Sequence, residues 1–359
     1  MKNINLLVRS LNAGGAEGVA VKLANELSNN GNNKVNLITL LGERNQTLGS
    51  KVADSVSIIF FRKKRAAYTL FSLTKLLVSS KQDDIFISFN YETTMMLNVI
   101  NKLLFKKVKV ISRNINTISK NLDLSRTSFI SKFVYFCFNK IYFDSDIIVN
   151  QCNAMQEDMI SLFPFHQNKM RVIYNPVIFD YNDFSKQNEF DKYILYVGRL
   201  ERQKSVHRLI EIFSKLNDKS INLVIAGDGS MKQSLIELTE KLGLSSRIFF
   251  LGVTSDVAKL YYNAQLTALT SLYEGFPNVL IESISYGTPV VSFDCPSGPA
   301  EIINSDNGLL VKNNDVIHFL DCVELLLNNQ EDRETIRQSI ADFSISNIAF
   351  IYNNLIEEM

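Results

Sequence analysis

The stretch SLYEGFPNVLIESISYGTPVVSF (Ser271–Phe293) decides the fold, because it contains a loop, a helix and the beginning of a strand in close succession. An apolar, β-branched run, Leu266–Thr270, precedes it, and the strand predicted over Pro289–Phe293 ends it. Gly275 and Pro277 keep the helix from starting directly after the first strand. A strand, a helix and a second strand in this order are typical of a parallel sheet covered by helices.

The same alternation of short strands and longer helices runs through the whole chain, which predicts an α/β protein with two doubly wound, Rossmann-like domains. In the first half we predict strands over Ile4–Val8, Lys34–Thr39, Ile85–Phe89, Lys109–Ser112, Ile147–Asn150 and Arg171–Tyr174. In the second half we predict strands over Tyr193–Val197, Asn222–Ala226, Ile248–Leu251, Leu266–Thr270 and Pro289–Phe293.

The polar stretch NPVIFDYNDFSKQNEFDKY (175–193) contains a proline and no periodic pattern, so it is predicted to link the two domains. We therefore expect a first domain over residues 1–178 and a second over 179–341. The remaining residues, 342–359, form an amphipathic helix pattern with apolar side chains at Ile348, Phe350, Ile351 and Leu355. The pattern leaves open whether this helix packs back on the first domain.

The composition indicates a folded protein of the cytoplasm. The 359 residues are 46% hydrophobic and 21% charged, which is ordinary for a globular protein of two domains. The four cysteines are far apart, with no CxxC pair, which argues against a zinc site and a disulfide framework. No apolar window is long enough to span a membrane, and the N-terminus lacks the pattern of an export signal.

Two glutamates of the opening stretch, Glu274 and Glu282, lie eight positions apart. A helix that begins at about Asn278 leaves Glu274 on the loop and places Glu282 about one turn inside the helix. Both carboxylates can then face one ligand at the carboxyl edge of the sheet. The N–H groups and partial positive charge of a helix N-terminus suit a diphosphate. Taken alone, Glu282 is equally well explained as a polar residue early in a helix.

Two cations follow another strand in YVGRLERQKSVHRLIEIF (196–213). Arg199 and Lys204 come after a glycine turn and before a helix, where cations can stabilise a departing nucleoside diphosphate without a metal ion. Because surface arginines and lysines are usually only solvated, this pair is weak support by itself.

Gly14 and Gly15 join the first strand to the first helix in RSLNAGGAEGVAVKLANEL (9–27). Glycines let the backbone approach a ligand closely, as in phosphate-binding turns, but the spacing fits neither GxGxxG nor a P-loop. Two further turns, AGDG (226–229) and LGVTSD (251–256), follow strands of the second half and are expected at the same sheet edge.

Taken in order, these segments resemble the retaining glycosyltransferases of family four. The resemblance covers nearly the whole chain, and the ordered set is specific although each piece is not. It runs through GGAE, Asn175–Pro176, VGRLERQK, AGDG, EGFPNVLIE and GTPVVSFDCPSGPAEII. It implies the GT-B architecture, two facing Rossmann-like domains with a cleft between them.

The resemblance also implies roles for the loop and helix around the glutamates. In that family two glutamates enclose seven residues, as here; the first contacts the transferred sugar and the second the nucleotide ribose. This assigns Glu274 to the sugar and Glu282 to the ribose, and it places Phe276, Pro277 and Asn278 around the sugar and phosphate.

For the diphosphate, Arg199 and Lys204 match the family's clamp. Gly15, next to Gly14, matches the glycine that brings the backbone of the first domain to the phosphates. The implied reaction retains the α-configuration of the donor, with the leaving phosphate taking the acceptor's proton on the same face. The implied catalytic residues are Glu274, Arg199 and Lys204.

The sequence departs from the family in its first half, where members often have a histidine near the sugar. His166 lies in the loop FPFHQNK, which we expect at the surface, and we assign no catalytic residue to the first domain. Asp144 and Asp146 form a DxD, which holds a divalent ion in the other large transferase fold. Because they lie between an apolar helix and a strand, we interpret them as a polar turn and expect no metal.

The first 178 residues are basic, with 23 Lys and Arg against 12 Asp and Glu, whereas the remainder has 15 against 25. Positive charge gathers at Arg62–Arg65 and around residue 105, next to apolar side chains. The residues concerned are Lys102, Lys106, Lys107 and Lys109, with Phe61, Tyr68, Phe71, Leu103, Leu104 and Phe105. Such a surface suits an anionic bilayer, but a solvated face over ordinary core residues explains it equally well. The resemblance favours the membrane, since many such enzymes extend polyprenyl-linked sugars at the inner leaflet.

The leading hypothesis is a metal-independent enzyme that transfers a hexose or N-acetylhexosamine from a UDP-sugar to a polyprenyl-linked or oligosaccharide acceptor. It would serve capsule, O-antigen or glycolipid assembly, in the cytoplasm or on the cytoplasmic face of the inner membrane. The segment PSGPAEII resembles that of enzymes for galactose-type and N-acetylhexosamine donors, and no nucleic-acid module is recognisable. Two alternatives keep the fold: a nucleotide-sugar epimerase, and a retired transferase that serves as a binding subunit.

Overall fold

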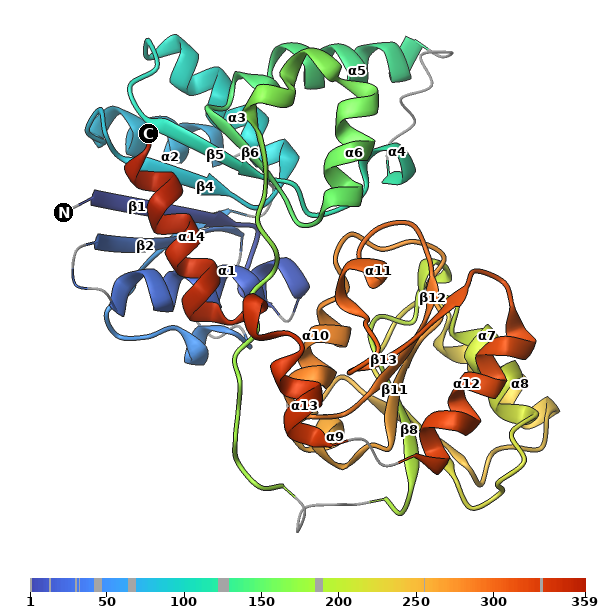
Figure 1. Ribbon diagram of the computed structural model, residues 1–359. Coiled ribbons are helices and arrows are strands. Elements are labelled where there is room, and N and C mark those ends of the chain that lie inside the picture. Colours follow the sequence, from blue (N-terminus) through green and yellow to red (C-terminus); the bar gives the residue numbers. More distant parts are fainter. Residues whose placement is uncertain are drawn as a thin grey trace. The chain divides into compact units, whose positions relative to one another are not determined.

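The structure, a computed structural model, divides the chain into two units (Figure 1). It describes residues 2–12, 14–29, 31, 33–41, 47–63, 69–121, 129–184, 190–254, 256–329 and 332–359, without the side chains of 62–63, 120–121 and 129. Unit 1 comprises Met1–Pro176 and Ile345–Met359, and unit 2 comprises Val177–Ser344. These divisions lie close to the boundaries expected after residues 178 and 341.

Unit 1 is built on a seven-stranded sheet in the order β3-β2-β1-β4-β5-β6-β7, and every neighbouring pair is parallel. The strands are β1 (Lys2–Val8), β2 (Asn33–Leu41), β3 (Ser57–Lys63), β4 (Ile85–Ser88), β5 (Lys109–Arg113), β6 (Ile147–Asn150) and β7 (Met170–Val172). Leu6 of β1, for example, pairs with Leu37 of β2 and with Ile87 of β4.

Helices cover both faces of this sheet. Because side chains alternate along a strand, Ile4 and Leu6 pack on one face with α1 (Gly15–Asn29) and α14 (Ile345–Glu357). Leu7 packs on the other face with α2 (Leu70–Ser79) and α3 (Tyr91–Leu103). A further cluster joins α5 to α6 and to β6. The smaller helical elements of this unit are α4 (Ile118–Asn121), α5 (Phe129–Lys140) and α6 (Asn153–Leu162), with the short turns η1 (Gly49–Lys51), η3 (Tyr142–Asp144) and η4 (Pro164–Lys169).

The C-terminal helix α14 packs against α1 within unit 1. Ile348 and Leu355 are buried there, whereas Phe350 is 62% exposed and Ile351 is 37% exposed, so the predicted apolar face is wrong for these two. The buried face contains Tyr352 and four apolar residues three or four positions away from it, a spacing that fits the period of a helix better.

Unit 2 contains a six-stranded parallel sheet in the order β10-β9-β8-β11-β12-β13. Its strands are β8 (Tyr193–Val197), β9 (Asn222–Ala226), β10 (Ile248–Gly252), β11 (Leu266–Leu269), β12 (Val290–Asp294) and β13 (Gly308–Lys312). Its helices are α7 (Val206–Ser214), α8 (Lys232–Lys241), α9 (Val257–Asn263), α10 (Asn278–Ser285), α11 (Pro299–Ile302), α12 (Val316–Asn328) and α13 (Arg333–Gln338), with η6 (Arg202–Lys204) and η7 (Ala341–Phe343).

The predicted strands are confirmed to within about two residues, but two strands were missed, β3 and β13. Both lie at an edge of their sheet. Edge strands are often short and end in lysine, as β3 does at Lys63 and β13 does at Lys312, and this charge weakens the apolar signal.

Among the described residues, no helix is both long enough and apolar enough to cross a membrane.

Candidate active site

The strand order of unit 2 reverses between β8 and β11, which are hydrogen-bonded neighbours. The chain after β8 leads to α7, and the chain after β11 leads to α10. In open parallel sheets, the loops at such a reversal leave a crevice at the carboxyl ends of the strands, where ligands bind. The loop 198–205 and the loop 270–277 therefore form the candidate site of this unit.

These two loops are joined by hydrogen bonds. The backbone N–H of Leu272 donates to the carbonyl of Gln203 at 2.8 Å, and the side-chain amide of Gln203 donates to the carbonyl of Tyr273 at 2.7 Å. The hydroxyl of Thr270 donates to the carbonyl of Ser205 at 3.2 Å. This network fixes the two loops against each other, next to the residues that carry charge.

Lys204 and Glu274 form a buried ion pair across the two loops. The Lys204 Nζ lies 2.6 Å from Glu274 Oε1 and 2.9 Å from Oε2, and the two side chains are only 15% and 7% exposed. The hydroxyl of Ser271 also donates to Glu274 Oε1, at 2.5 Å. Charge-assisted hydrogen bonds of this kind offset part of the cost of burying the carboxylate.

Arg199 lies on the loop that contains Lys204, and its side chain is exposed. Within the part of the chain that the structure describes, its guanidinium makes no ion pair or hydrogen bond. Its backbone is held by a side chain of β8, because the hydroxyl of Tyr196 donates to the Arg199 carbonyl at 3.1 Å. Burial, and then the charge of Glu274, raises the pKa of Tyr196 well above its ordinary value, so this hydroxyl stays protonated.

The AGDG turn supports this loop through close backbone packing. At Gly227 φ is 151°, and a Cβ there would lie 1.8 Å from the carbonyl oxygen of Gly198. Only glycine allows this approach, and it brings the turn after β9 directly against the turn after β8.

Helix α10 begins at Asn278, as predicted, with Glu274 on the loop before it and Glu282 in its second turn. The hydroxyl of Tyr261 donates to Glu282 Oε2 at 3.4 Å, and the Tyr261 ring stacks on Tyr286 with centroids 6.0 Å apart. Burial, and then the charge of Glu282, raises the pKa of Tyr261 well above its ordinary value. Tyr261 therefore remains a donor that orients the Glu282 carboxylate.

Phe276 and Pro277 are in contact with other parts of unit 2. The Phe276 ring is 5% exposed and packs edge-on against Phe343, with centroids 5.6 Å apart and planes at 84°. A Cβ at Gly298, where φ is 90°, would lie 2.6 Å from Pro277 Cδ. Because the ring of Phe276 is engaged in this way, a ligand contact by Phe276 falls to its backbone rather than to its side chain.

Gly14 and Gly15 lie in unit 1, at the start of α1. The Gly14 carbonyl accepts the N–H of Gly18 at 2.9 Å, so Gly14 occupies the cap position of the helix. A Cβ at Gly14 would lie 2.3 Å from Glu17 Oε2. An anion bound at this helix end therefore has to share the space with the carboxylate of Glu17.

The buried Arg113, at the end of β5, was missed in the sequence analysis. It is 1% exposed and donates to the Tyr352 hydroxyl at 2.5 Å and to the side-chain oxygen of Asn175. No ion pair of the described residues includes it. A lone arginine in the apolar strand sequence KVISR was the only available signal.

The DxD carboxylates have protein partners. Asp144 pairs with Lys102 at 2.9 Å, and Asp146 accepts the backbone N–H of Val110 at 2.8 Å. Both carboxylates thus hold the turn between η3 and β6 in place.

His166 is half-buried, so it lies at the surface with part of its ring covered. Its ring stacks on Phe143 with centroids 4.1 Å apart, and its Nε2 lies 2.8 Å from the side-chain oxygen of Asn139. Burial, followed by the charges of Lys169 and Lys140, lowers the pKa of His166. The aromatic contact with Phe143 draws this side chain inward.

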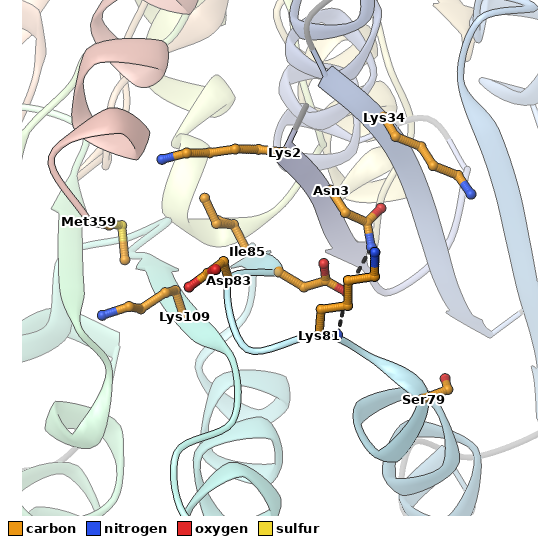
Figure 2. Close-up of a pocket in the computed structure, with 10 residues that line it drawn as sticks. Lys2, Asn3, Lys34, Ser79, Lys81, Asp83, Ile85, Lys109 and Met359 are labelled. Carbon is orange, nitrogen blue, oxygen red and sulfur yellow. Dashed lines mark hydrogen bonds between the residues drawn. The ribbon is translucent and has the colours of Figure 1, made fainter.

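A cavity of about 680 Å³ lies within unit 1, at the amino edge of its sheet (Figure 2). Its lining consists of Lys2, Asn3, Lys34, Ser79, Lys81, Asp83, Asp84, Ile85, Lys109 and Met359. The Lys2 ammonium donates to the carbonyl of Ile356 in the last turn of α14. Lysines at this edge complement the negative helix ends that gather there, and we assign no ligand to the cavity.

Part of the chain matches a known family model, and the whole chain has similar relatives. Residues 179–342 match the family model of glycosyl transferases group 1. The chain is 28% identical, over 385 aligned positions, to the Campylobacter jejuni GalNAc-α-(1→4)-GalNAc-α-(1→3)-diNAcBac-PP-undecaprenol α-1,4-N-acetyl-D-galactosaminyltransferase, with 100% of this chain and 99% of the relative covered. The family match covers just under half of the chain, most of unit 2, and together with this full-length relative it shows that the chain is a glycosyltransferase.

Further comparisons agree with the fold and activity of this glycosyltransferase. The amylovoran biosynthesis glycosyltransferase AmsD of Erwinia amylovora is 28% identical, with 82% of this chain and 81% of the relative covered. The crystal structure of Anabaena HepE in complex with UDP-glucose superimposes with a TM-score of 0.82 at 17% identity, covering 100% of both chains. The predicted GT-B fold and glycosyltransferase activity are confirmed, and neither alternative, the epimerase or the binding subunit, is supported.

Proposed function

We propose that this glycosyltransferase moves a hexose or N-acetylhexosamine from a UDP-sugar to a lipid-linked saccharide, with retention of configuration and without a metal ion. The observation that carries the proposal is the buried Lys204–Glu274 pair at the strand-order reversal of unit 2. Two of the similar proteins support the choice of acceptor and donor: the Campylobacter relative is named for an undecaprenol-linked acceptor, and HepE was solved with UDP-glucose.

In this proposal the donor's diphosphate lies between Arg199 and Lys204, next to the start of α10. An ammonium group has three hydrogens, and two of them suffice for the two oxygens of Glu274, at 2.6 and 2.9 Å. The third is available for a phosphate oxygen. Arg199 contributes an exposed guanidinium on the same loop, and Glu282, oriented by Tyr261, accepts hydrogen bonds from the ribose hydroxyls.

Glu274 is proposed to orient the sugar rather than to attack it. Lys204 and Ser271 fix its carboxylate, which accepts hydrogen bonds from sugar hydroxyls in this proposal. A positioned hydrogen-bond acceptor of this kind restricts the sugar to one orientation above the diphosphate.

The proposed reaction exchanges one bond at the anomeric carbon for another on the same face. The bond between that carbon and the β-phosphate oxygen breaks, and UDP leaves with the electron pair. The acceptor hydroxyl forms the new bond and gives its proton to the leaving phosphate. Arg199 and Lys204 stabilise the charge that develops on this phosphate, which is the role a metal ion has in other transferases.

Release of UDP tests the proposal directly. The protein is incubated with UDP-hexoses and UDP-N-acetylhexosamines, with and without an undecaprenyl-diphosphate-linked saccharide, in the presence and absence of a chelator. We expect UDP release that depends on the acceptor and survives chelation, and an α-linkage in the NMR spectrum of the product. A β-linked product would exclude retention of configuration. Loss of activity with the chelator would exclude metal independence. UDP release at the same rate with and without the acceptor would exclude transfer to that acceptor.

The matched control for Lys204 is Lys232, the first residue of α8, whose ammonium forms a surface ion pair with Asp228 at 3.0 Å. Both are lysines of unit 2 with a carboxylate partner. Lys204→Met should lower the rate of UDP release, and Lys232→Met should leave it unchanged. Equal effects of the two substitutions would remove Lys204 from the proposed site.

A further inference from the structure

Unit 1 exposes large apolar side chains along two of its helices, which we call the α3–α5 surface. At the end of α3, Leu103 is 74% exposed and Phe105 is 94% exposed. Along α5, Ile130, Phe133 and Phe136 are 74%, 59% and 55% exposed. Single exposed apolar residues are common, but a group on neighbouring elements marks an interaction surface.

The turn after α3 is strained in a way that presents Phe105 to solvent. Phe105 has a φ of 59° and Lys106 a φ of 55°, a conformation that bulky residues rarely adopt. Asn101 holds the turn: its side chain donates to the carbonyl of Val108 at 2.8 Å and accepts the Val108 N–H at 3.0 Å. Strain that the surroundings maintain in this way is typical of functional segments.

The outer side of α5 carries a regular apolar stripe. Ile130, Phe133 and Phe136 follow one another at intervals of three residues and therefore share one side of the helix. The opposite side packs into the core of unit 1 through Phe138, which is 1% exposed. The helix is thus apolar on both its buried and its exposed sides, which is unusual for a helix that faces only water.

Hydrogen bonds and an ion pair hold the end of α3 against the end of α5. The side-chain amide of Asn98 on α3 donates to the carbonyls of Ile141 and Tyr142, at 2.8 and 3.0 Å, just after α5 ends. Lys102 of α3 pairs with Asp144 of η3. These contacts place the end of α3 next to the end of α5 on the side of the sheet that α2 and α3 cover (Figure 1).

Positive charge predominates on this surface, where Asp144 is paired with Lys102. Residues 93–121 and 129–143 contain no aspartate or glutamate. The lysines of these two segments whose side chains are described are Lys102, Lys106, Lys107, Lys109, Lys132 and Lys140. Lys106, Lys132 and Lys140 are exposed among the apolar side chains. An aromatic and aliphatic surface bordered by lysines complements a layer of anionic headgroups over hydrocarbon.

We infer that the α3–α5 surface docks the protein onto an anionic lipid bilayer. Phe105 and the α5 stripe enter the boundary between headgroups and acyl chains, while the lysines contact the headgroups. The inference identifies the surface that would meet the membrane in which a lipid-linked acceptor is anchored. Only the mention of a lipid-linked acceptor depends on the proposed function. Binding of the surface to lipid needs neither the donor nor the acceptor.

The structure also sharpens the basic region predicted from the sequence. Phe61 and Leu104 pack against the core of unit 1 and are not part of the surface, whereas Leu103 and Phe105 are. The side chains of Arg62–Arg65 and Tyr68 lie outside the described residues.

Vesicle flotation tests the inference without any nucleotide sugar. The full chain is mixed with vesicles of phosphatidylcholine alone or of phosphatidylcholine with phosphatidylglycerol. We expect binding only to the anionic vesicles, weakened by salt. The double variant Lys132→Gln/Lys140→Gln should bind roughly thirtyfold more weakly, since each lysine near the surface contributes about a factor of five. Phe133→Ser/Phe136→Ser should weaken binding at least about tenfold.

Matched controls come from unit 2. Ile317 on α12 is 75% exposed, and Lys241 on α8 is exposed. Ile317→Ser and Lys241→Gln should leave vesicle binding unchanged, and far-ultraviolet circular dichroism checks that every variant is folded. Vesicle binding that the α5 variants do not weaken would overturn the inference. A second result would also overturn it: a wild-type protein that does not bind anionic vesicles and sediments as a dimer, while Phe133→Ser/Phe136→Ser sediments as a monomer. A second copy of the chain would then cover this surface.

Activity on a water-soluble oligosaccharide acceptor separates this inference from the proposed function. The α5 variants should transfer sugar to that acceptor at the wild-type rate. A protein that binds vesicles but transfers no sugar would contradict the proposed function alone.

Discussion

In each unit a cation with little exposure lies near the carboxyl end of the sheet, Lys204 in unit 2 and Arg113 in unit 1, and the two cations differ in their partners. Lys204 of unit 2 is paired with the carboxylate of Glu274, whereas Arg113 of unit 1 donates to the neutral side chains of Tyr352 and Asn175. Lys204 remains 15% exposed, and Arg113 is 1% exposed.

The difference agrees with the proposed donor site in unit 2 and with a structural role for Arg113 in unit 1. A lysine that shares its hydrogens with a carboxylate at an open sheet edge can also bind a phosphate. Arg113, by contrast, connects β5 to α14 and to the segment before residue 176, and its burial leaves no approach for a ligand. The substitutions below are expected to affect activity in unit 2 and stability in unit 1.

Removal of Glu274 should have the largest effect. Glu274→Ala is expected to lower kcat/KM by about a thousandfold or more, because the sugar loses its orienting acceptor. It also leaves Lys204 buried without its partner, which should lower the free energy of unfolding by about 3–5 kcal/mol. Initial rates of UDP release and urea denaturation measure the two effects. Wild-type activity in Glu274→Ala would remove this residue from the mechanism.

Removal of both members of the pair should separate stability from activity. Lys204→Met alone should lower kcat/KM by about a hundredfold to a thousandfold and destabilise unit 2, because Glu274 then remains buried as an unpaired charge. The double variant Lys204→Met/Glu274→Leu should regain most of the lost stability and none of the activity. A double variant as unstable as the single ones would show that the pair is not energetically coupled.

Substitution of Arg113 should lower stability and leave UDP binding unchanged. Arg113→Met removes the buried guanidinium and its two hydrogen bonds, so the buried oxygens of Tyr352 and Asn175 lose this donor. The free energy of unfolding of unit 1 should therefore fall by about 3 kcal/mol. UDP affinity, measured by calorimetry, should not change. A loss of UDP binding in a folded Arg113→Met protein would assign Arg113 to a site.

The smallest effect concerns Cys295, a buried neighbour of the pair. Burial, and then the charge of Glu274, raises the pKa of its thiol to about 12. The unfolded thiol ionises at 9.0, so this contribution to stability is complete below pH 9.0 and falls as the pH rises from there towards 12. Cys295→Ser should reduce the loss of stability above pH 9.0 in urea titrations at increasing pH. An unchanged pH dependence would contradict the cause given for the shift.

The sequence predicted what depends on local pattern and on the ordered motifs. The start of α10 at Asn278 and the positions of Glu274 and Glu282 followed from one glycine, one proline and one apolar run. The doubly wound sheets followed from the alternation of strands and helices. The strands β3 and β13 were not predicted; each lies at an edge of its sheet and ends in lysine, which weakens the apolar pattern.

The remainder depends on contacts between residues far apart in the chain. The sequence does not show that Phe276 packs on Phe343, that His166 stacks on Phe143, or that Arg113 meets Tyr352. The hydrogen bond from Ser271 to Glu274 likewise depends on the folded loop, and the spacing of the sequence does not indicate it.

A crystal structure of the protein with bound UDP tests the central claim most directly. The claim predicts the diphosphate within hydrogen-bonding distance of Arg199 and Lys204, at the edge between β8 and β11, and the ribose hydroxyls on the carboxylate of Glu282. UDP bound elsewhere in unit 2, with Lys204 and Glu282 turned away from it, would contradict the claim.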